Sequence, residues 1–270
     1  VIANRTNFFF KTWNFIFRRL TGQTILEKQI RAVEQEFASD IWLINTVTLP
    51  NVVAIASKLN KKAFLFAHEL IQIFGRLSNS EIKQVAYFPT KILCCSNAVK
   101  NMFQILNRTE NISVVYPGID IEFYRNLQDK KIENIPNDAF IWAMTGNIDE
   151  NKDPIFFLNL AKILLTQHKK AYMVWFGNIN YDGGLFFYCT KLVQKFQIED
   201  RVIWAGNTKD SYTAYFKNID AFVLTSSYES FSMVTLEAIT MGKPVVTYNS
   251  GGVQEILGPE YPLAKAKTIG

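Results

Sequence analysis

The feature that most constrains the fold is a repeated alternation of short apolar runs with stretches of helical periodicity. Runs such as KAFLFA at 62–67 and FIWAMT at 140–145 have the length of strands and are too short for buried helices. Each run is followed by a polar turn and then by a helical pattern, which is the order of parallel βαβ units. The sequence therefore predicts an α/β protein built on parallel sheets.

The same pattern gives the expected elements along the chain. We expect strands at 40–45, 62–67, 91–95, 112–115, 140–145, 172–176, 201–205, 220–225 and 244–247. We expect helices at 48–60, 79–88, 97–106, 153–167, 184–197, 210–218, 232–241 and 252–257. Asp153 and Pro154 suit a helix start, since Asp is a good N-cap and Pro fits the first helical position.

The rhythm is broken once, by the charged and amide-rich stretch NLQDKKIENIPND at 126–138. Such a stretch is typical of a linker, and a chain of 270 residues is comfortable for two domains. We therefore predict a Rossmann-like N-terminal domain at 1–127, a linker at 128–138 and a second Rossmann-like domain at 139–270. No G-x-G-x-x-G follows any expected strand, which disfavours a dinucleotide-binding oxidoreductase.

Composition and charge limit the function classes further. The chain is 49% hydrophobic and its net charge is +5, an excess too small for a nucleic-acid-binding surface. The three cysteines show neither a disulfide framework nor metal-ligand spacing, so a reducing compartment, the cytoplasm, is expected. No apolar run approaches the ~18–20 residues of a membrane span.

The segment 5–31 mixes aromatic with basic side chains and leaves two interpretations open. As a basic aromatic face it could contact the inner face of an anionic membrane peripherally. Alternatively, its aromatics are the core-facing side chains of an ordinary domain helix.

The stretch SSYESFSMVTLEAITMGKPVVTYNSGGVQE at 226–255 carries the most chemical information. Glu229 is expected in a loop leaving a strand, and the next helix begins near Phe231, Ser232 and Met233, where unpaired N–H groups favour an anion such as phosphate. Glu237 follows within the first two turns of that helix. Ligands of open α/β sheets bind at the carboxyl ends of the strands. The two carboxylates are therefore placed to bind two different parts of one nucleotide-sugar.

The run ESFSMVTLEA, with MGKPVV and SGGVQEI after it, resembles the Glu-x7-Glu signature of glycosyltransferase family 4. Other segments resemble that family in the expected order: FLFAHEL at 64–70 its strand ending in His, VVYPGIDIEFY at 114–124 its "nGvD...F" turn, GNIDENK at 146–152 its G-R-L-x-x-x-K segment, and RVIWAGN at 201–207 its base-side strand. The resemblance spans roughly residues 38–258. It implies the GT-B architecture of two facing Rossmann-like domains, the first on the acceptor side and incomplete, the second binding the nucleotide-sugar.

The resemblance implies a retaining, metal-independent transferase without a cofactor, which moves a sugar from a UDP- or GDP-sugar to a saccharide or lipid-linked acceptor. Glu229 would contact the sugar, Glu237 the ribose, and Lys152 the diphosphate. The implied catalytic residues are Glu229, His68 and Lys152. The implied nucleotide-sugar-binding residues are Gly146, Asn147, Lys152, Asn207, Thr208, Glu229, Phe231, Ser232, Met233, Val234 and Glu237.

Two departures from the family pattern matter. Asn147 stands where the family has Arg, so one cationic phosphate contact is missing. The opening strand with its Gly-rich loop and the closing helices of the family have no counterpart in this sequence, which favours a fragment lacking both ends. The alternative is therefore a non-catalytic, degenerate nucleotide-sugar-binding module. A related epimerase or phosphorylase is disfavoured because their characteristic site residues are not recognised. Ser232, where Gly is common, is expected to be a mild change that suits a helix start.

Overall fold

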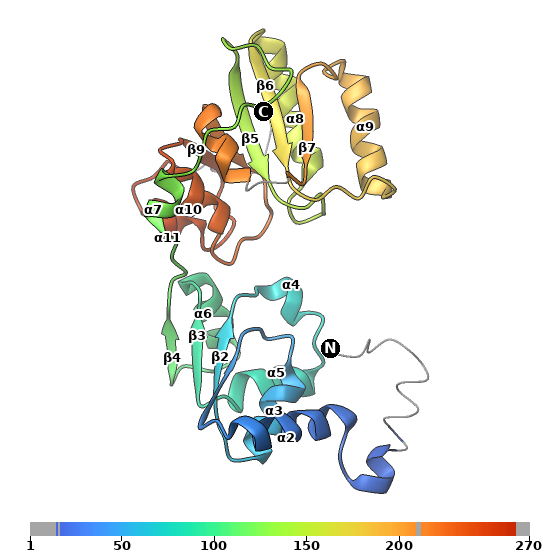
Figure 1. The fold of residues 1–270 in the computed structure, drawn as a ribbon, viewed down its shortest axis with the longest axis vertical. Coiled ribbons are helices and arrows are strands. Elements are labelled where there is room, and N and C mark those ends of the chain that lie inside the picture. The colour runs from blue at the N-terminus through green and yellow to red at the C-terminus, as the bar shows by residue number, and fades with distance from the viewer. Residues whose placement is uncertain (1–14, 16, 209–211, 263–270) are drawn as a thin grey trace. The chain divides into compact units, whose positions relative to one another are not determined.

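The structure is a computed structural model that describes residues 15, 17–208 and 212–262. The chain divides into two compact units, Val1–Cys94 with Lys100–Val114 and Cys95–Val99 with Val115–Gly270. Each unit contains one parallel sheet, as the alternating pattern predicts (Figure 1). Residues 115–127 fall in the second unit. The predicted domain boundaries, 1–127 and 139–270 around a linker, remain a prediction.

The first unit holds a four-stranded sheet in the order β1-β2-β3-β4. Its strands are β1 (Ile41–Ile44), β2 (Lys62–Ala67), β3 (Lys91–Cys94) and β4 (Ile112–Val114), and all neighbours pair in parallel. Its helices are α2 (Ile25–Phe37), α3 (Pro50–Lys58), α4 (Ile71–Phe74), α5 (Asn79–Tyr87) and α6 (Asn97–Ile105), the last of which starts within residues that cluster with the second unit. Strand β2 buries alternate residues, so Ala63, Leu65 and Ala67 face the core that α3 covers.

The second unit holds a five-stranded parallel sheet in the order β7-β6-β5-β8-β9. Its strands are β5 (Phe140–Thr145), β6 (Ala171–Phe176), β7 (Val202–Gly206), β8 (Ala221–Leu224) and β9 (Val245–Thr247). Its helices are α7 (Ile121–Arg125), α8 (Pro154–Gln167), α9 (Gly184–Phe196), the 3₁₀ helix η1 (Tyr212–Asn218), α10 (Met233–Thr240) and α11 (Val253–Leu257). The chain runs outward from β5 to β7 and then returns to the other side of β5, so the strand order reverses between β5 and β8.

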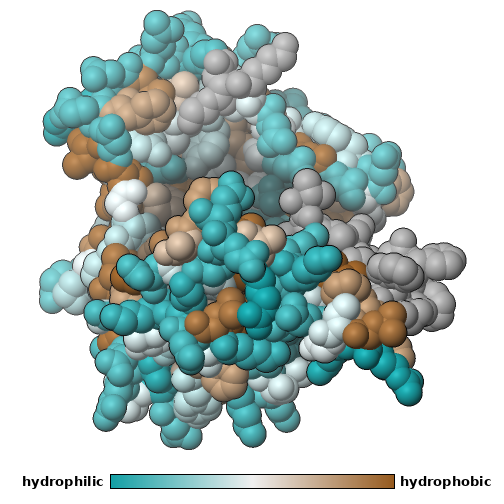
Figure 2. Space-filling model, turned by 60° about the horizontal axis from the view of Figure 1, so that its bottom comes forward, coloured by the Kyte–Doolittle hydropathy of each residue, from teal (hydrophilic) through white to brown (hydrophobic). Residues whose placement is uncertain are grey.

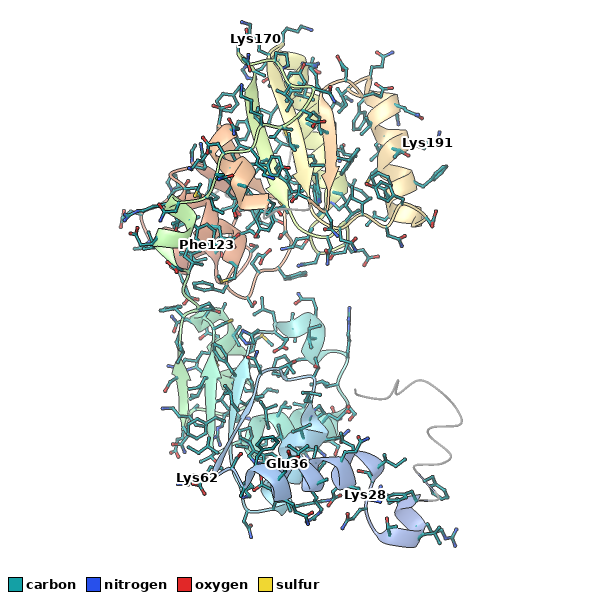
Figure 3. The ribbon with its side chains drawn as sticks, viewed as in Figure 1. Lys28, Glu36, Lys62, Phe123, Lys170 and Lys191 are labelled. Carbon is teal, nitrogen blue, oxygen red and sulfur yellow. The ribbon has the colours of Figure 1, made fainter. Side chains whose placement is uncertain are left out.

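Strands β6 and β8 are buried almost along their whole length, as expected for parallel strands covered on both faces. Phe157 of α8 packs edge-on against Trp175 of β6, with ring centroids 5.1 Å apart. Helix α8 contacts both β6 and α9, and Lys191 points away from the sheet on the outer side of α9 (Figures 1 and 3). This core fixes the carboxyl ends of the strands, where the predicted site residues lie.

The expected strands, and all expected helices except the one at 210–218, agree with the structure to within one or two residues. The helix predicted at 210–218 is instead a 3₁₀ helix from Tyr212, with 210 and 211 outside the described residues. Helix α2 was not among the expected helices, although an ordinary domain helix was one interpretation of the segment 5–31. The short helices α4 and α7 were also not predicted, because four or five residues hold too little periodicity to be recognised. The N-cap of α7 is Asp120, whose carboxylate accepts a hydrogen bond from Phe123 N.

The described part of the chain holds no helix that is both long and apolar enough to cross a membrane. The face shown in Figure 2 is mainly hydrophilic, with separate apolar spots. Most of the basic aromatic stretch before residue 17 lies outside the described residues. Within the described residues Phe15 and Leu20 are exposed, and Lys28 lies over the ring of Phe17. All three cysteines are described and buried, and they form no disulfide.

Candidate nucleotide-sugar site

The predicted residues of the second unit gather at the carboxyl edge of its sheet, around the reversal between β5 and β8. Lys152 lies in the loop after β5, and Glu229 lies in the loop after β8. Although 77 positions separate them in sequence, β5 and β8 are paired neighbours in the sheet. In open α/β sheets such a reversal leaves a crevice in which ligands bind.

An ion pair crosses this reversal. The Nζ of Lys152 donates to Oε1 of Glu229 at 2.6 Å, and only 19% and 10% of the two side chains are exposed. Lys152 lies directly over Gly146, where a Cβ would come within 2.9 Å of the lysine side chain. The absence of a side chain at Gly146 therefore makes room for the lysine that reaches Glu229.

The two loops are also joined through their backbones. Asn151 donates from Nδ2 to Tyr228 O and accepts from Tyr228 N, each at 3.1 Å. Thr225 Oγ1 donates to Lys152 O at 2.7 Å, and Ser227 N donates to Asn151 O at 2.7 Å. These bonds hold Lys152 and Glu229 in place independently of their own ion pair.

Glu229 is fixed on its other side by the turn after β9. Its backbone N donates to Ser250 O at 2.7 Å, and Gly252 N donates to its carbonyl at 2.8 Å. A Cβ at Gly252 would lie 2.2 Å from Ser230 O, so only glycine permits this approach. The Gly-rich turn identified in the sequence therefore supports the Glu229 loop.

Helix α10 begins beside Glu229 with Ser232 as its N-cap. Ser232 adopts φ 79°, in the left-handed region, and its hydroxyl bonds Thr235 Oγ1 rather than a backbone N–H of the helix. The expectation that Ser suits this position is therefore wrong: the backbone conformation is one that favours glycine. Phe231 precedes the cap, and Met233 and Val234 form the first turn.

Glu237 is buried in α10 and is held by two tyrosine hydroxyls. Tyr124 of α7 donates to Oε1 at 2.8 Å, and Tyr212 of η1 donates to Oε2. Burial raises the pKa of the Glu237 carboxyl, and the two hydroxyls act against this shift by stabilising the charged form. Burial beside this carboxylate also raises the pKa of Tyr124 to about 12.

Three neighbouring strands end in the same dipeptide. Gly146-Asn147 follows β5, Gly177-Asn178 follows β6, and Gly206 ends β7 before Asn207. All three glycines have positive φ, and all three asparagines are exposed at one sheet edge. Asn207 Nδ2 approaches Asn178 Oδ1 at 3.4 Å. Asn147 and Asn207 were predicted site residues, and Thr208 follows Asn207 with partial exposure.

Three residues near the predicted site were missed by sequence reasoning: Tyr124, Tyr212 and Asn178. The repeated Gly-Asn pair after three apolar runs is a signal that could have identified Asn178. The two tyrosines carry no such signal, because their approach to Glu237 depends on how α7 and η1 pack on α10.

His68, the remaining predicted residue, belongs to the first unit and follows β2. Its Nε2 lies 2.6 Å from Asn45 Oδ1, and its ring packs edge-on against Phe66. The adjacent Glu69 accepts from the backbone N of His68 and of Val47. These bonds join the loops after β1 and β2 and fix the position of the imidazole. No group of three or more potential metal ligands gathers among the residues that the structure describes.

Comparisons with known proteins identify the family of the chain. The family described as "Glycosyl transferases group 1" matches residues 126–267, more than half of the chain. The chain therefore belongs to this family, and the resemblance to glycosyltransferase family 4 is confirmed.

Individual relatives match part of the chain. N-acetyl-alpha-D-glucosaminyl L-malate synthase of Bacillus anthracis is 36% identical over 163 residues, 59% of this chain and 41% of that protein. UDP-Gal:alpha-D-GlcNAc-diphosphoundecaprenol alpha-1,3-galactosyltransferase of Escherichia coli is 26% identical over 174 residues, 60% of this chain and 43% of that protein. The chain thus spans less than half the length of these curated relatives.

Among solved structures, Anabaena HepE in complex with UDP-glucose matches with a TM-score of 0.72 at 18% sequence identity. The match covers 88% of this chain and 66% of that one. At this identity the likeness establishes the fold, and the predicted GT-B fold class is confirmed.

Proposed function

We propose that this chain binds a nucleoside diphosphate sugar, UDP- or GDP-linked, and transfers the sugar to a saccharide or lipid-linked acceptor with retention of configuration. The observation that carries the proposal is the Lys152–Glu229 ion pair at the strand-order reversal, with the start of α10 beside it. The family relationship and the UDP-glucose bound by the similar HepE fold support a sugar nucleotide as the ligand.

The proposed roles follow from charge and position. The Lys152 cation and the N–H groups at the start of α10, near Met233 and Val234, would stabilise the negative charge that develops on the leaving diphosphate. Glu229 would accept hydrogen bonds from the sugar hydroxyls, together with the backbone of Phe231 and Ser232. Glu237 would accept from the ribose.

Lys152 has to serve two anions in this scheme. In the structure it is paired with Glu229, and a diphosphate would add a second anionic partner. A lysine ammonium has three donors, so it can bond both at once. The carboxylate near the anomeric carbon would also stabilise an oxocarbenium-like transition state, as carboxylates do in glycoside hydrolysis.

Asn147, Asn207 and Thr208 complete the proposed donor site at the ends of β5 and β7. Their side chains offer hydrogen bonds without charge, which suits ribose, base and phosphate oxygens. The role of His68 in the reaction stays a prediction, which kinetics of His68→Ala with saturating donor would address.

A thermal-shift screen of UDP, GDP, ADP and their sugars tests the donor site, with Glu237→Ala as the comparison variant. A ligand at 100 times its Kd stabilises the native state by ~2.7 kcal/mol. We expect a shift with at least one nucleoside diphosphate, reduced in the variant. No shift with any of these nucleotides would refute the donor site.

A second candidate function is nucleotide-sugar binding without transfer. It is favoured by Asn147 at the position of the family's Arg and by the neutralisation of Lys152 by Glu229. The two candidates differ in turnover: release of UDP or GDP from the sugar nucleotide that gives the largest shift supports transfer or hydrolysis. Tight binding with no release, even when saccharide acceptors are added, would favour the binding module.

The proposal extends to the N-terminal, acceptor-side domain, whose residues 5–31 would contact an anionic membrane peripherally. Exposed Phe15 and Leu20, together with the basic residues of the segment, support it. Co-sedimentation with vesicles that contain phosphatidylglycerol is expected to decrease as salt is raised. Absence of co-sedimentation, or binding that ignores salt, would remove this part of the proposal.

A further inference from the structure

Two tyrosine hydroxyls from separate elements converge on the same carboxylate. Tyr124 comes from α7 and bonds Oε1 of Glu237, while Tyr212 comes from η1 and bonds Oε2. Helices α7 and η1 both contact α10, and in Figure 1 α7 lies beside α10. Each oxygen of one carboxylate thus has its own donor, and neither donor is adjacent to Glu237 in the sequence.

This arrangement fixes the direction of the carboxylate. The terminal torsion of a glutamate side chain is broad, so a single hydrogen bond would leave the group free to rotate. A donor on each oxygen defines its plane. An ionised carboxylate offers about four lone-pair sites, so two hydroxyls leave room for two further donors. The two adjacent hydroxyls of a ribose are a ligand of that kind.

The donors are also neutral, which matters for the charge. A lysine or arginine in place of either tyrosine would neutralise Glu237, as Lys152 does for Glu229. Tyrosine hydroxyls instead stabilise the ionised form while leaving its negative charge for the ligand. They counteract the burial that raises the pKa of this carboxyl.

The other ionisable groups on the elements packed against α10 are engaged elsewhere. In α7, Glu122 pairs with Arg125. In η1, Lys217 bonds Leu127 O and pairs with Asp129, and the Tyr215 ring packs against Phe176. In α11, Glu255 accepts from the backbone N of Asn97 and from the Tyr116 hydroxyl. Strands β8 and β9 contribute no ionisable side chain. Tyr124 and Tyr212 are therefore the titratable groups that face Glu237 among the described residues.

We propose that Tyr124 and Tyr212 are positioning residues, whose hydroxyls orient the Glu237 carboxylate and keep it ionised for the ribose hydroxyls of a nucleoside diphosphate. This inference rests on the proposed function, because it assigns a role within the same donor site. In the "nGvD...F" pattern the last position is Phe, and here that position is Tyr124. Its neighbour Phe123 is half exposed on α7, where Figure 3 labels it. Tyr124 thus keeps the aromatic ring that the "nGvD...F" pattern has at this position and adds a hydroxyl to it.

The test is UDP binding by calorimetry between pH 5 and 8 for the wild type, Tyr124→Phe, Tyr212→Phe and the double variant. Tyr188→Phe, half exposed on α9, is the matched control. Each single variant is expected to bind UDP about 3- to 10-fold more weakly at neutral pH, the loss of one typical hydrogen bond. The hydroxyls lower the pKa of Glu237, so their removal should let this carboxylate become protonated at a higher pH. As the pH is lowered, the UDP affinity of the variants should therefore begin to decrease at a higher pH than that of the wild type.

The outcomes separate this inference from the proposed function. If the wild type binds UDP and Glu237→Ala does not, the donor site stands. In that case unchanged affinity in the folded double variant, or a weakening that is equal at every pH, would overturn the positioning role. If the wild type binds UDP, GDP and ADP no better than Glu237→Ala does, both the donor site and the positioning role fail. A thermal melt of each variant shows whether it is folded.

Discussion

Lys152 and Glu229 form a 2.6 Å ion pair that joins the loop after β5 to the loop after β8. Both side chains are largely buried, so each charge depends on the other for compensation. The pair is also the place where a sugar and a diphosphate would meet in the proposed site. A contact that stabilises the fold is therefore also part of the proposed binding machinery.

A double-mutant cycle separates these contributions. Lys152→Met leaves the buried Glu229 carboxylate without its cation and is expected to lower the free energy of unfolding by about 2 kcal/mol. Adding Glu229→Gln removes the uncompensated charge, so the double variant should recover at least about 1 kcal/mol. Urea denaturation of the four proteins measures the coupling. Additive losses would show that the two charges do not stabilise each other.

The glycines at the ends of β5 and β6 are predicted to differ in their tolerance of a methyl group. A Cβ at Gly177 would lie 2.3 Å from the backbone O of Gly146, and φ there is 123°. Gly177→Ala should therefore cost about 3 kcal/mol or more. At Gly146 the nearest atoms belong to the flexible Lys152 side chain, so Gly146→Ala should cost less but displace the lysine and weaken UDP binding.

Gly184 provides the control for this pair, because nothing lies within 4 Å of a Cβ placed there at the start of α9. Gly184→Ala should leave stability unchanged or raise it slightly, by up to about 1 kcal/mol. Equal melting temperatures for the Gly177 and Gly184 variants would contradict the packing argument.

Ser232 is predicted to tolerate replacement by glycine better than replacement by alanine. With φ at 79°, an alanine Cβ is strained, whereas glycine is not. Both Ser232→Ala and Ser232→Gly lose the contact with Thr235, so their difference isolates the backbone. The glycine variant should be more stable than the alanine variant by about 1 kcal/mol. Chemical denaturation of the two variants, compared with each other, decides the point.

The βαβ alternation was enough to predict both sheets, since apolar strand runs and capped helices are local signals. The Glu-x7-Glu spacing likewise placed Glu229 and Glu237 on a loop and the helix that follows it. The ion pair between Lys152 and Glu229 could not be read from sequence, because it depends on β5 and β8 being neighbours. Parallel strands carry no local mark of their order in a sheet.

Ser232 shows a second limit of sequence reasoning. Serine is a common helix N-cap, and this preference favoured an ordinary helix start. The observed left-handed conformation follows instead from the sharp turn by which the chain passes from the supported Glu229 loop into α10. The tyrosines at Glu237 show the same dependence, since tertiary packing brings α7 and η1 to α10.

Glu237 is predicted to make stability depend on pH. Burial raises its native pKa above the ordinary value of 4.5, so between these two values the native state holds more protons than the unfolded state. The free energy of unfolding should therefore fall as pH rises through that window. Glu237→Gln removes this dependence and should be the more stable protein near pH 7, with the difference shrinking towards pH 4.

Denaturation at pH 4 to 8 measures this effect, with Glu150→Gln as the control because Glu150 is exposed in the loop after β5. The control should follow the wild-type profile. If the free energy of unfolding of Glu237→Gln changes with pH in parallel with that of the wild type, the Glu237 carboxyl has the same pKa in the native and unfolded states.

Asn147 offers a gain-of-function prediction. The family pattern has Arg at this position, and Asn147 is exposed at the carboxyl edge of β5, next to the glycine over which Lys152 lies. An Arg there would add a cation for a diphosphate whose nearest lysine is shared with Glu229. Asn147→Arg is expected to bind UDP about tenfold more tightly, the value of one charge-assisted hydrogen bond.

A variant with the opposite charge at position 147 serves as the comparison for Asn147→Arg. Asn147→Asp places a carboxylate where the diphosphate is proposed to bind, so it should weaken UDP binding by a similar factor, and both effects should diminish as salt is raised. Uridine, which lacks the phosphates, should bind the three proteins alike. Equal UDP affinities for the Arg and Asp variants would place the diphosphate away from the end of β5, whereas opposite changes confined to UDP would assign Asn147 to the phosphate subsite.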